Sequence, residues 1–372
     1  MITNLLKPMK KNCVIAFLIF SMLINAQVNR PQEPQKPFNY TSEDIYFTNY
    51  RADSIKLAGT LTLPKIKKNP LVAILISGSG PQNRNVELKG HKPFLVIADY
   101  LTNNGIAVLR FDDRGTDESE GDFKTATSFD FATDVEAAIA YLKTRTDVNT
   151  EKIGLIGHSE GGLIAPIVAA NPKNEVAFII LLSGPGVNGA KILETQSRRA
   201  GELAGTPEAV LIENEKLAHM IYGIILSEHD EEVIKSKITK SLNDYKFKNP
   251  LSILAPYITD TMIEQQISVL KSPWLLNFIR TEPKDFLQKT TCPVLALNGS
   301  KDFQVLPKIN LEGIKKGLEI AKNEDVTIME LEGLNHLFQT AETGSIQEYS
   351  TIEETFSPTA LEIIKDWILE RF

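Results

Sequence analysis

The sequence is poor in cysteine, with only Cys13 and Cys292 among 372 residues. Cys13 lies in an N-terminal segment that we expect to be removed, so an intrachain disulfide is excluded in the mature chain. There is no Cys-x-x-Cys pair and no histidine-rich stretch, and the five histidines are scattered. The sequence therefore supports neither a metal site nor any other cofactor.

Basic stretches and long hydrophobic runs are also lacking. The formal net charge is −7, and the absence of a basic stripe argues against a nucleic-acid partner. The apolar run at residues 14–24 is shorter than the roughly 20 residues that a membrane-spanning helix needs. With 42 % hydrophobic and 23 % charged residues, the composition indicates a globular protein: one large α/β domain with an insertion, or two domains.

The apolar run at residues 14–24 has the features of a secretion signal. Three lysines precede it, and it ends shortly before Ala26, a small residue suited to cleavage. We interpret residues 1–26 as a signal peptide that directs the protein to the periplasm or outside the cell, with no stable membrane insertion after cleavage. An anchor that stays uncleaved is the alternative. A lipid anchor is excluded because Cys13 precedes the run.

Apolar patterns along the rest of the chain predict its organisation. Residues 27–41, rich in Pro, Gln and Asn, predict a flexible leader. Residues 43–48 and 55–63 alternate apolar with polar side chains, as an antiparallel hairpin at a sheet edge does. Short apolar runs alternating with helical patterns then predict buried parallel strands at residues 71–76, 106–109, 153–156, 176–182, 294–297 and 326–331.

Strand patterns stop between residues 190 and 288, where helical patterns rich in Glu and Lys replace them. We interpret residues 190–288 as a helical cap inserted into an α/β core of residues 42–189 and 289–372, at the sheet edge where such proteins bind ligands. Trp274 and Phe278 lie in its most apolar stretch. They either pack the cap against the core or line a substrate pocket.

The strand at 153–156 leads into a G-x-S-x-G motif at residues 157–161, and a helical pattern follows. In this context the motif predicts a sharp turn that holds the serine in a strained conformation with its hydroxyl exposed. Ser159 is therefore the candidate nucleophile. The alternative is a glycine-rich turn in which the serine has no catalytic role.

A serine nucleophile needs a base, and an acid that orients the base. His336 follows the last predicted strand, and Asp302 follows the strand before it. The order Ser159, Asp302, His336 is the one expected for an α/β hydrolase. Glu332 and Asp325 remain alternatives for the acid.

A loop of small residues follows the strand at 71–76, which leaves backbone N–H groups free to point at a ligand. We predict an oxyanion hole formed by the backbone N–H groups of Ser79 and Glu160, with Gly78 and Gly80 beside the substrate. An ordinary glycine turn is the alternative.

A charged turn is predicted at residues 110–121, which read RFDDRGTDESEG. We interpret Asp112 and Asp113 as turn-forming carboxylates that neutralise Arg110 and Arg114.

Six blocks of the sequence together resemble the bacterial serine esterases of the esterase D type, which are related to serine aminopeptidase-like and prolyl-oligopeptidase-like α/β hydrolases. The blocks are ISGSGPQNRN, LRFDDRGTDESEGDF, GLIGHSEGG, SPWLLNFI, CPVLALNGSKDFQV and GLNHLFQTAETG. The resemblance runs from about residue 42 to the C-terminus. It implies an α/β-hydrolase fold: a mostly parallel eight-stranded sheet with helices on both faces and a helical cap. It also implies carboxylesterase activity on short acyl chains, with the triad on Ser159, Asp302 and His336 and the oxyanion loop on residues 77–80.

Two positions depart from the pattern of these esterases. Asp117 replaces the glycine of a loop that usually reads RG-x-G-x-S, and Ser77 stands where many relatives have histidine. Neither change touches the triad, so we expect them to affect the turn or the substrate preference.

The sequence therefore predicts a serine carboxylic-ester hydrolase (EC 3.1.1.-) that acts on small acyl esters through an acyl-enzyme. A peptidase or amidase, a thioesterase or a C–C bond hydrolase on the same triad remain alternatives. So does a non-catalytic binding protein, although such proteins usually lose a triad member.

Overall fold

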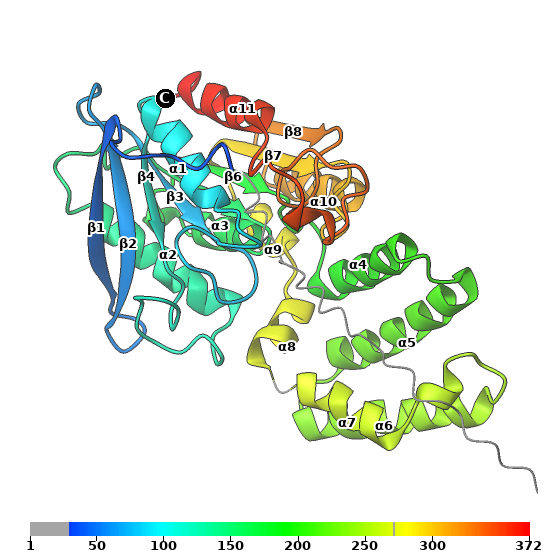
Figure 1. Ribbon diagram of the computed structural model, residues 1–372. Helices are drawn as coiled ribbons and strands as arrows, with labels where there is room; N and C mark the ends of the chain where they lie inside the picture. The colour runs from blue at the N-terminus through cyan, green and yellow to red at the C-terminus, as the bar shows by residue number, and fades with distance from the viewer. Residues whose placement is uncertain (1–29, 271) are drawn as a thin grey trace, which may run out of the picture.

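The computed structural model describes residues 30–270 and 272–372, so the expected signal peptide at residues 1–26 lies outside the described residues. The strands form one eight-stranded sheet in the order β1-β2-β4-β3-β5-β6-β7-β8 (Figure 1). The pairs β1–β2 and β2–β4 are antiparallel, and the other neighbours are parallel. The strands are β1 (Tyr40–Asn49), β2 (Ile55–Pro64), β3 (Val72–Ile76), β4 (Ala107–Phe111), β5 (Ile153–His158), β6 (Phe178–Leu182), β7 (Val294–Gly299) and β8 (Val326–Leu331).

Helices cover both faces of this sheet because successive side chains of the buried strands point to opposite faces. Ile74 and Leu155 pack on the face covered by α2, α3 and α10, whereas Leu75 and Ile156 pack on the face covered by α1 and α11. The helices are α1 (Pro93–Asn103), α2 (Ser128–Leu142), α3 (Gly161–Ala169), α10 (Pro307–Ile320) and α11 (Pro358–Leu369), with 3₁₀ turns at Pro172–Asn174 and Glu348–Ser350. The predicted mostly parallel sheet with helices on both faces is confirmed.

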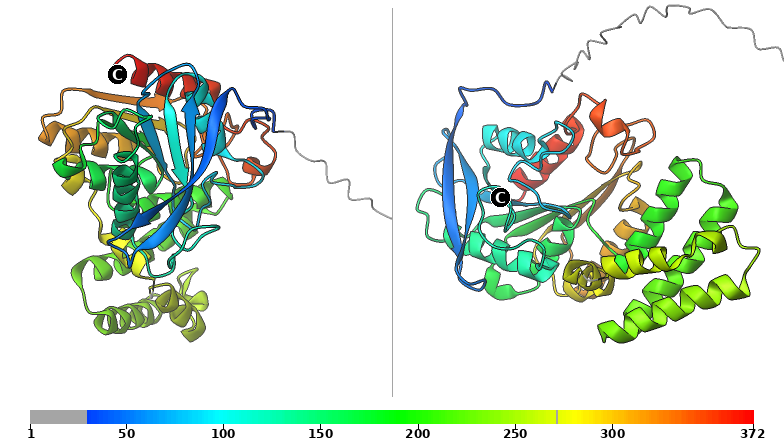
Figure 2. Two further views of the ribbon diagram at one scale, coloured as in Figure 1. Left: turned by 90° about the vertical axis from the view of Figure 1, so that its left-hand side faces the viewer. Right: turned by 60° about the horizontal axis from the view of Figure 1, so that its bottom comes forward.

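A group of helices follows β6 and precedes β7, and we call α4–α9 the cap. Its elements are α4 (Gly189–Leu203), α5 (Glu208–Ser227), α6 (Glu231–Lys248), α7 (Asp260–Val269), α8 (Pro273–Arg280) and α9 (Lys284–Leu287), with a 3₁₀ turn at Ala255–Tyr257. The right-hand view of Figure 2 shows most of the cap beside the sheet, on the side away from the β1–β2 hairpin. None of the helices described here is long and apolar enough to cross a membrane.

The cap has a small apolar core and a separate contact with the eight-stranded sheet and its helices α1–α3, α10 and α11, which we call the sheet domain. Ile225, Ile238 and Ile279 belong to the cap core. At the contact, Phe278 of α8 packs in one cluster with Leu163 of α3. α8 of the cap therefore meets the start of α3, the helix that follows the G-x-S-x-G motif.

The segment at the start of the described chain is held against the sheet domain. The Gln32 amide donates to the Phe356 carbonyl at 2.7 Å, and its oxygen accepts from the N–H groups of Thr355 and Phe356 at 2.6 and 3.0 Å. Glu33 forms an ion pair with Lys92. These contacts differ from the flexibility expected of the leader at residues 27–41, because composition does not reveal hydrogen-bond partners more than 300 residues away; residues 27–29 lie outside the described residues.

Candidate active site

Ser159 stands on a sharp turn between β5 and α3. Its φ is 54°, a left-handed value that residues other than glycine rarely adopt. An added Cβ on Gly157 would lie 2.0 Å from the Gly161 carbonyl oxygen, and one on Gly161 would lie 2.2 Å from the Ile76 carbonyl oxygen. Only glycine fits on either side of the serine, so the predicted strained turn is confirmed.

His336 and Asp302 lie in loops that follow β8 and β7. His336 Nδ1 is 2.8 Å from Asp302 Oδ2, and both residues are buried. The second carboxylate oxygen of Asp302 accepts from the N–H groups of Gln304 and Val305 at 2.8 and 2.9 Å. These bonds fix the carboxylate, which in turn fixes the imidazole.

The other two acids that the sequence offers as partners of His336 lie elsewhere. Asp325 pairs with Arg371 at 2.9 Å, and Glu332 is exposed. Of the three, Asp302 is the acid in contact with His336.

A cavity of about 250 Å³ brings residues of the sheet domain and the cap together. Ser159, His336, Gly78, Ser79 and Glu160 all line it. Three neutral amides, from Gln82, Gln196 and Gln304, supply further polar groups. Gly80, which we predicted beside the substrate, is not among the described residues that line this cavity.

Trp274 and Phe278 of α8 form one wall of the cavity. Their rings stack with centroids 5.2 Å apart at an angle of 11°. Phe278 also packs against the sheet domain. The packing that the sequence offered as one alternative is confirmed for Phe278, and both rings also line the cavity.

The two backbone N–H groups that the sequence predicts to form an oxyanion hole make no hydrogen bond within the described residues. Among residues 30–270 and 272–372, no acceptor bonds to the N–H of Glu160 or of Ser79. The loop that carries Ser79 passes close to the nucleophile, since an added Cβ on Gly78 would lie 3.1 Å from Ser159 Cβ. Both donors are thus on segments that adjoin Ser159.

Asp113 holds this loop at both ends. One carboxyl oxygen accepts from the Ser77 hydroxyl at 2.5 Å, and the other accepts from the Gln82 N–H at 2.9 Å. Burial raises the pKa of Asp113 to about 8, although both donors oppose the shift. Ser77 therefore anchors the start of the loop through its bond to Asp113.

The predicted pairing of Asp112 and Asp113 with Arg110 and Arg114 is wrong. Asp112 pairs with Arg84 at 2.5 Å. Arg114 pairs instead with Asp134 of α2 at 2.7 Å. Neighbouring residues at the end of β4 point in different directions, so each finds a partner from another segment.

Asp117, which departs from the glycine of the esterase pattern, adopts a left-handed conformation that glycine favours. Its φ is 48° and its side chain is exposed. This conformation destabilises a residue that has a Cβ by about 1–2 kcal/mol, and glycine removes part of that strain.

Asp117→Gly is therefore expected to raise the free energy of unfolding by about 0.5–1 kcal/mol, as measured by urea titration. An unchanged or lower free energy of unfolding would contradict this prediction.

His158 is the variable residue before Ser159 in the motif, and it forms a hydrogen bond to the loop that carries His336. Its Nε2–H donates to the His336 carbonyl oxygen at 2.8 Å, and the two rings are 4.8 Å apart. Burial lowers the pKa of His158 to about 4, with a further contribution from nearby His336. The imidazole is therefore neutral at ordinary pH and acts as a donor. The one sequence signal for this contact is the presence of a histidine at the variable position of the motif.

The lowered pKa of His158 predicts a pH-dependent stability. Between about pH 6.5 and 4 the unfolded chain takes up a proton that the folded imidazole excludes, so acid favours unfolding. As the pH falls through this window, we expect the free energy of unfolding of wild type to fall relative to that of His158→Gln, by at most about 1.4 kcal/mol per pH unit. Urea unfolding of both proteins from pH 7 to 4.5 tests this, because other groups titrate in both. Parallel stability curves would contradict it.

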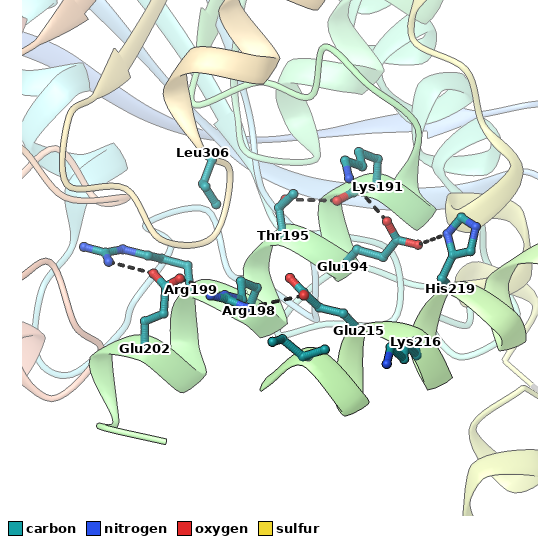
Figure 3. A pocket seen from close by; sticks show the side chains of 11 residues that line it. Lys191, Glu194, Thr195, Arg198, Arg199, Glu202, Glu215, Lys216, His219 and Leu306 are labelled. Atoms are coloured by element: carbon teal, nitrogen blue, oxygen red, sulfur yellow. Dashed lines mark hydrogen bonds and ion pairs between the residues drawn. The ribbon is translucent and has the colours of Figure 1, made fainter. Parts of the chain in front are cut away.

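A second hollow of about 480 Å³ lies between α4 and α5 (Figure 3). Several of its charged side chains pair with one another, among them Arg198 with Glu215, and His219 with Glu194. Neither Ser159 nor any partner of it lines this hollow. In the described chain, no group of three or more His, Cys, Asp or Glu side chains is placed to hold a metal ion.

A profile of the family described as "Serine aminopeptidase, S33" matches residues 92–342. Esterase EstD of Thermotoga maritima is 23 % identical over 342 residues, which cover 91 % of this chain and 70 % of EstD.

Two solved structures share the fold. An esterase of Pyrococcus furiosus, Pf2001, superposes with a TM-score of 0.53 at 16 % identity, covering 92 % of this chain and 97 % of that one. Dipeptidyl peptidase 4 of Porphyromonas gingivalis superposes with a TM-score of 0.52 at 13 % identity, covering 90 % of this chain and 36 % of that one. Because an esterase and a peptidase share this α/β-hydrolase fold, the fold alone does not choose between the two activities.

Proposed function

Since this chain belongs to the serine aminopeptidase (S33) family of α/β hydrolases, we propose that it is a serine carboxylesterase for small acyl esters. One observation carries the proposal: Ser159, the His336–Asp302 pair and two unbonded N–H groups adjoin a single cavity. The match to EstD supports the same reading.

In this mechanism Ser159 attacks the ester carbonyl while His336 takes the hydroxyl proton. Asp302 holds His336 in the tautomer that leaves Nε2 free to accept that proton, and it stabilises the imidazolium that forms. His336 then protonates the departing alcohol, leaving an acyl-enzyme. A water molecule activated by His336 releases the carboxylic acid and restores Ser159.

The tetrahedral intermediates place negative charge on the former carbonyl oxygen. The N–H groups of Glu160 and Ser79 are proposed to bind this oxygen. One such donor contributes about 3 kcal/mol to transition-state stabilisation, because it is fixed before the charge develops.

The lining of the cavity favours a small, neutral substrate. Its volume of about 250 Å³ is below the roughly 300–1,000 Å³ of pockets for drug-sized ligands. The described lining contains no lysine or arginine, and its one acid, Glu160, is buried and already accepts hydrogen bonds from Ser128 and Trp274, among others. A peptidase that reads a free amine needs an available carboxylate, so we propose an ester substrate in preference to a peptide.

A hydrolysis panel tests this choice. The p-nitrophenyl esters from acetyl to dodecanoyl would be compared with aminoacyl-p-nitroanilides, at about pH 7.5. We expect kcat/KM to be highest for the shortest esters, to fall steeply beyond about six carbons because the cavity is small, and to be negligible for the anilides. Anilide turnover at comparable efficiency would replace the esterase proposal with a peptidase.

We also propose that residues 190–288 act as a cap over the site and that residues 1–26 direct export. The lysines before an apolar run and the small Ala26 support the second point. Mature protein recovered from the periplasm or medium is expected to begin at Gln27. Retention of the first 26 residues would favour an anchor.

A further inference from the structure

Glu160 brings a carboxyl group to the cavity, yet the proposed mechanism uses only its backbone N–H. The residue is 2 % exposed and lies directly after the nucleophile. An acid buried this deeply in a small cavity needs a structural or functional reason, because the charge or the polar group would otherwise be poorly solvated.

The carboxyl group joins two parts of the protein. Its Oε1 accepts from the Ser128 hydroxyl at 2.6 Å and from the Trp274 indole Nε1–H at 2.7 Å. Ser128 begins α2 of the sheet domain, and Trp274 lies in α8 of the cap. Glu160 thus forms a hydrogen-bonded bridge between the sheet domain and the cap wall.

The bridge determines where Trp274 can lie. An indole N–H is a donor only, so Trp274 depends on an acceptor in its present position. Trp274 is half-buried, stacks on Phe278 and lines the cavity. The bond to Glu160 therefore fixes a ring that forms part of the cavity wall.

The partners of this carboxyl group are neutral. Burial raises the pKa of Glu160, and the hydrogen bonds from Ser128, Trp274 and the Ser79 hydroxyl oppose the shift. In the part of the chain that the structure describes, no lysine, arginine or histidine forms an ion pair with it. What Trp274 requires from Glu160 is an acceptor oxygen, which an amide also supplies.

We propose that Glu160 is a positioning residue whose bond to Trp274 holds the cap wall in place and so sets the length of acyl chain that the site accepts. This rests on the proposed esterase function. When the bond is lost, the indole ring is free to move out of the cavity and longer acyl chains can enter.

The test uses a matched pair of variants at Glu160. Glu160→Gln keeps the side-chain length and an acceptor oxygen, whereas Glu160→Met keeps the length and removes the acceptor. Trp274→Phe breaks the same bond from its other end. The chain has two tryptophans, and Trp367 lies in α11, bonded to Thr327. A Trp367→Phe background therefore leaves Trp274 as the only indole fluorophore.

Two readouts are compared in this background. In Glu160→Met the emission of Trp274 is expected to shift to longer wavelength and its quenching by acrylamide to increase, because the ring becomes more hydrated. In Glu160→Gln both are expected to stay at the values of the background protein. The ratio of kcat/KM for p-nitrophenyl octanoate over butanoate should rise about tenfold in Glu160→Met and Trp274→Phe, and not in Glu160→Gln.

The outcomes separate the inference from the function on which it rests. If wild type hydrolyses no ester, the esterase proposal fails, and so does the role of Glu160 in selecting acyl-chain length. The fluorescence emission of Trp274 still tests the hydrogen bond between Glu160 and Trp274 in that case. Unchanged Trp274 emission in Glu160→Met overturns the bridge. A shifted emission with an unchanged octanoate ratio overturns its role in specificity. If Glu160→Met does not fold, an unchanged ratio in Trp274→Phe overturns that role as well.

Discussion

Replacing Ser159 with alanine is expected to lower kcat for p-nitrophenyl butanoate by about ten-thousand-fold or more, with little change in KM. The side chain lost is the attacking group, and no other hydroxyl in the described chain shares its turn, its left-handed φ of 54° and its place on the cavity wall. The residual rate would come from the two N–H donors and from substrate binding alone.

Ser183→Ala provides a matched control for this experiment. Ser183 follows β6 as Ser159 follows β5, and it has a similar φ of 51°. Its hydroxyl is buried next to Asn298 and does not line the cavity. The control is expected to keep most of its activity. A Ser159→Ala protein with native circular dichroism and substantial turnover would show that another group is the nucleophile.

Replacing Asp302 with asparagine is expected to lower kcat by about a thousand- to ten-thousand-fold, in a protein that still folds. The asparagine oxygen can still accept from the N–H groups of Gln304 and Val305, so the loop after β7 is retained. Its NH₂ group would face His336 Nδ1, which favours the tautomer with the proton on Nε2. That tautomer cannot accept a proton from Ser159.

The sequence itself supplies the control for Asp302. Asp325→Asn changes an acid that directly precedes β8, at the opposite edge of the sheet from Asp302, and it is expected to keep near-normal kcat because Asp325 pairs with Arg371. Steady-state kinetics of both variants at about pH 7.5 make the comparison. Equal losses, or a loss in Asp325→Asn alone, would contradict the assignment of the acid.

Local pattern was sufficient to predict most of the fold. Residues 153–156 and 176–182 were expected to be strands, and the structure places β5 and β6 there with shifts of at most two residues at their ends. The reason is that buried parallel strands are apolar on both faces and therefore stand out against amphipathic helices.

The contacts around the nucleophile could not be predicted in the same way. Asp113 bonds to Ser77 and Gln82, and Arg114 bonds to Asp134, so local charge pairing was misleading. Glu160 likewise finds Trp274 across 114 positions of sequence. Such partners depend on how loops from several strands meet, which periodicity along one segment does not record.

The order of motifs predicted the pair His336–Asp302 because the chain order of an α/β hydrolase brings the ends of successive strands to one edge of the sheet. The supporting role of His158 was not predicted. Its ring contacts a carbonyl oxygen 178 positions away, and nothing in the G-x-S-x-G pattern specifies that contact.

The central claim is that Ser159 is the one covalent nucleophile of this protein, and modification with diethyl p-nitrophenyl phosphate tests it most directly. Wild type is expected to release one equivalent of p-nitrophenol and to carry a single diethylphosphoryl group, which peptide mass spectrometry locates on Ser159. The Ser159→Ala protein is expected to remain unmodified. A wild-type protein that stays unmodified, or one modified at another residue, would contradict the account.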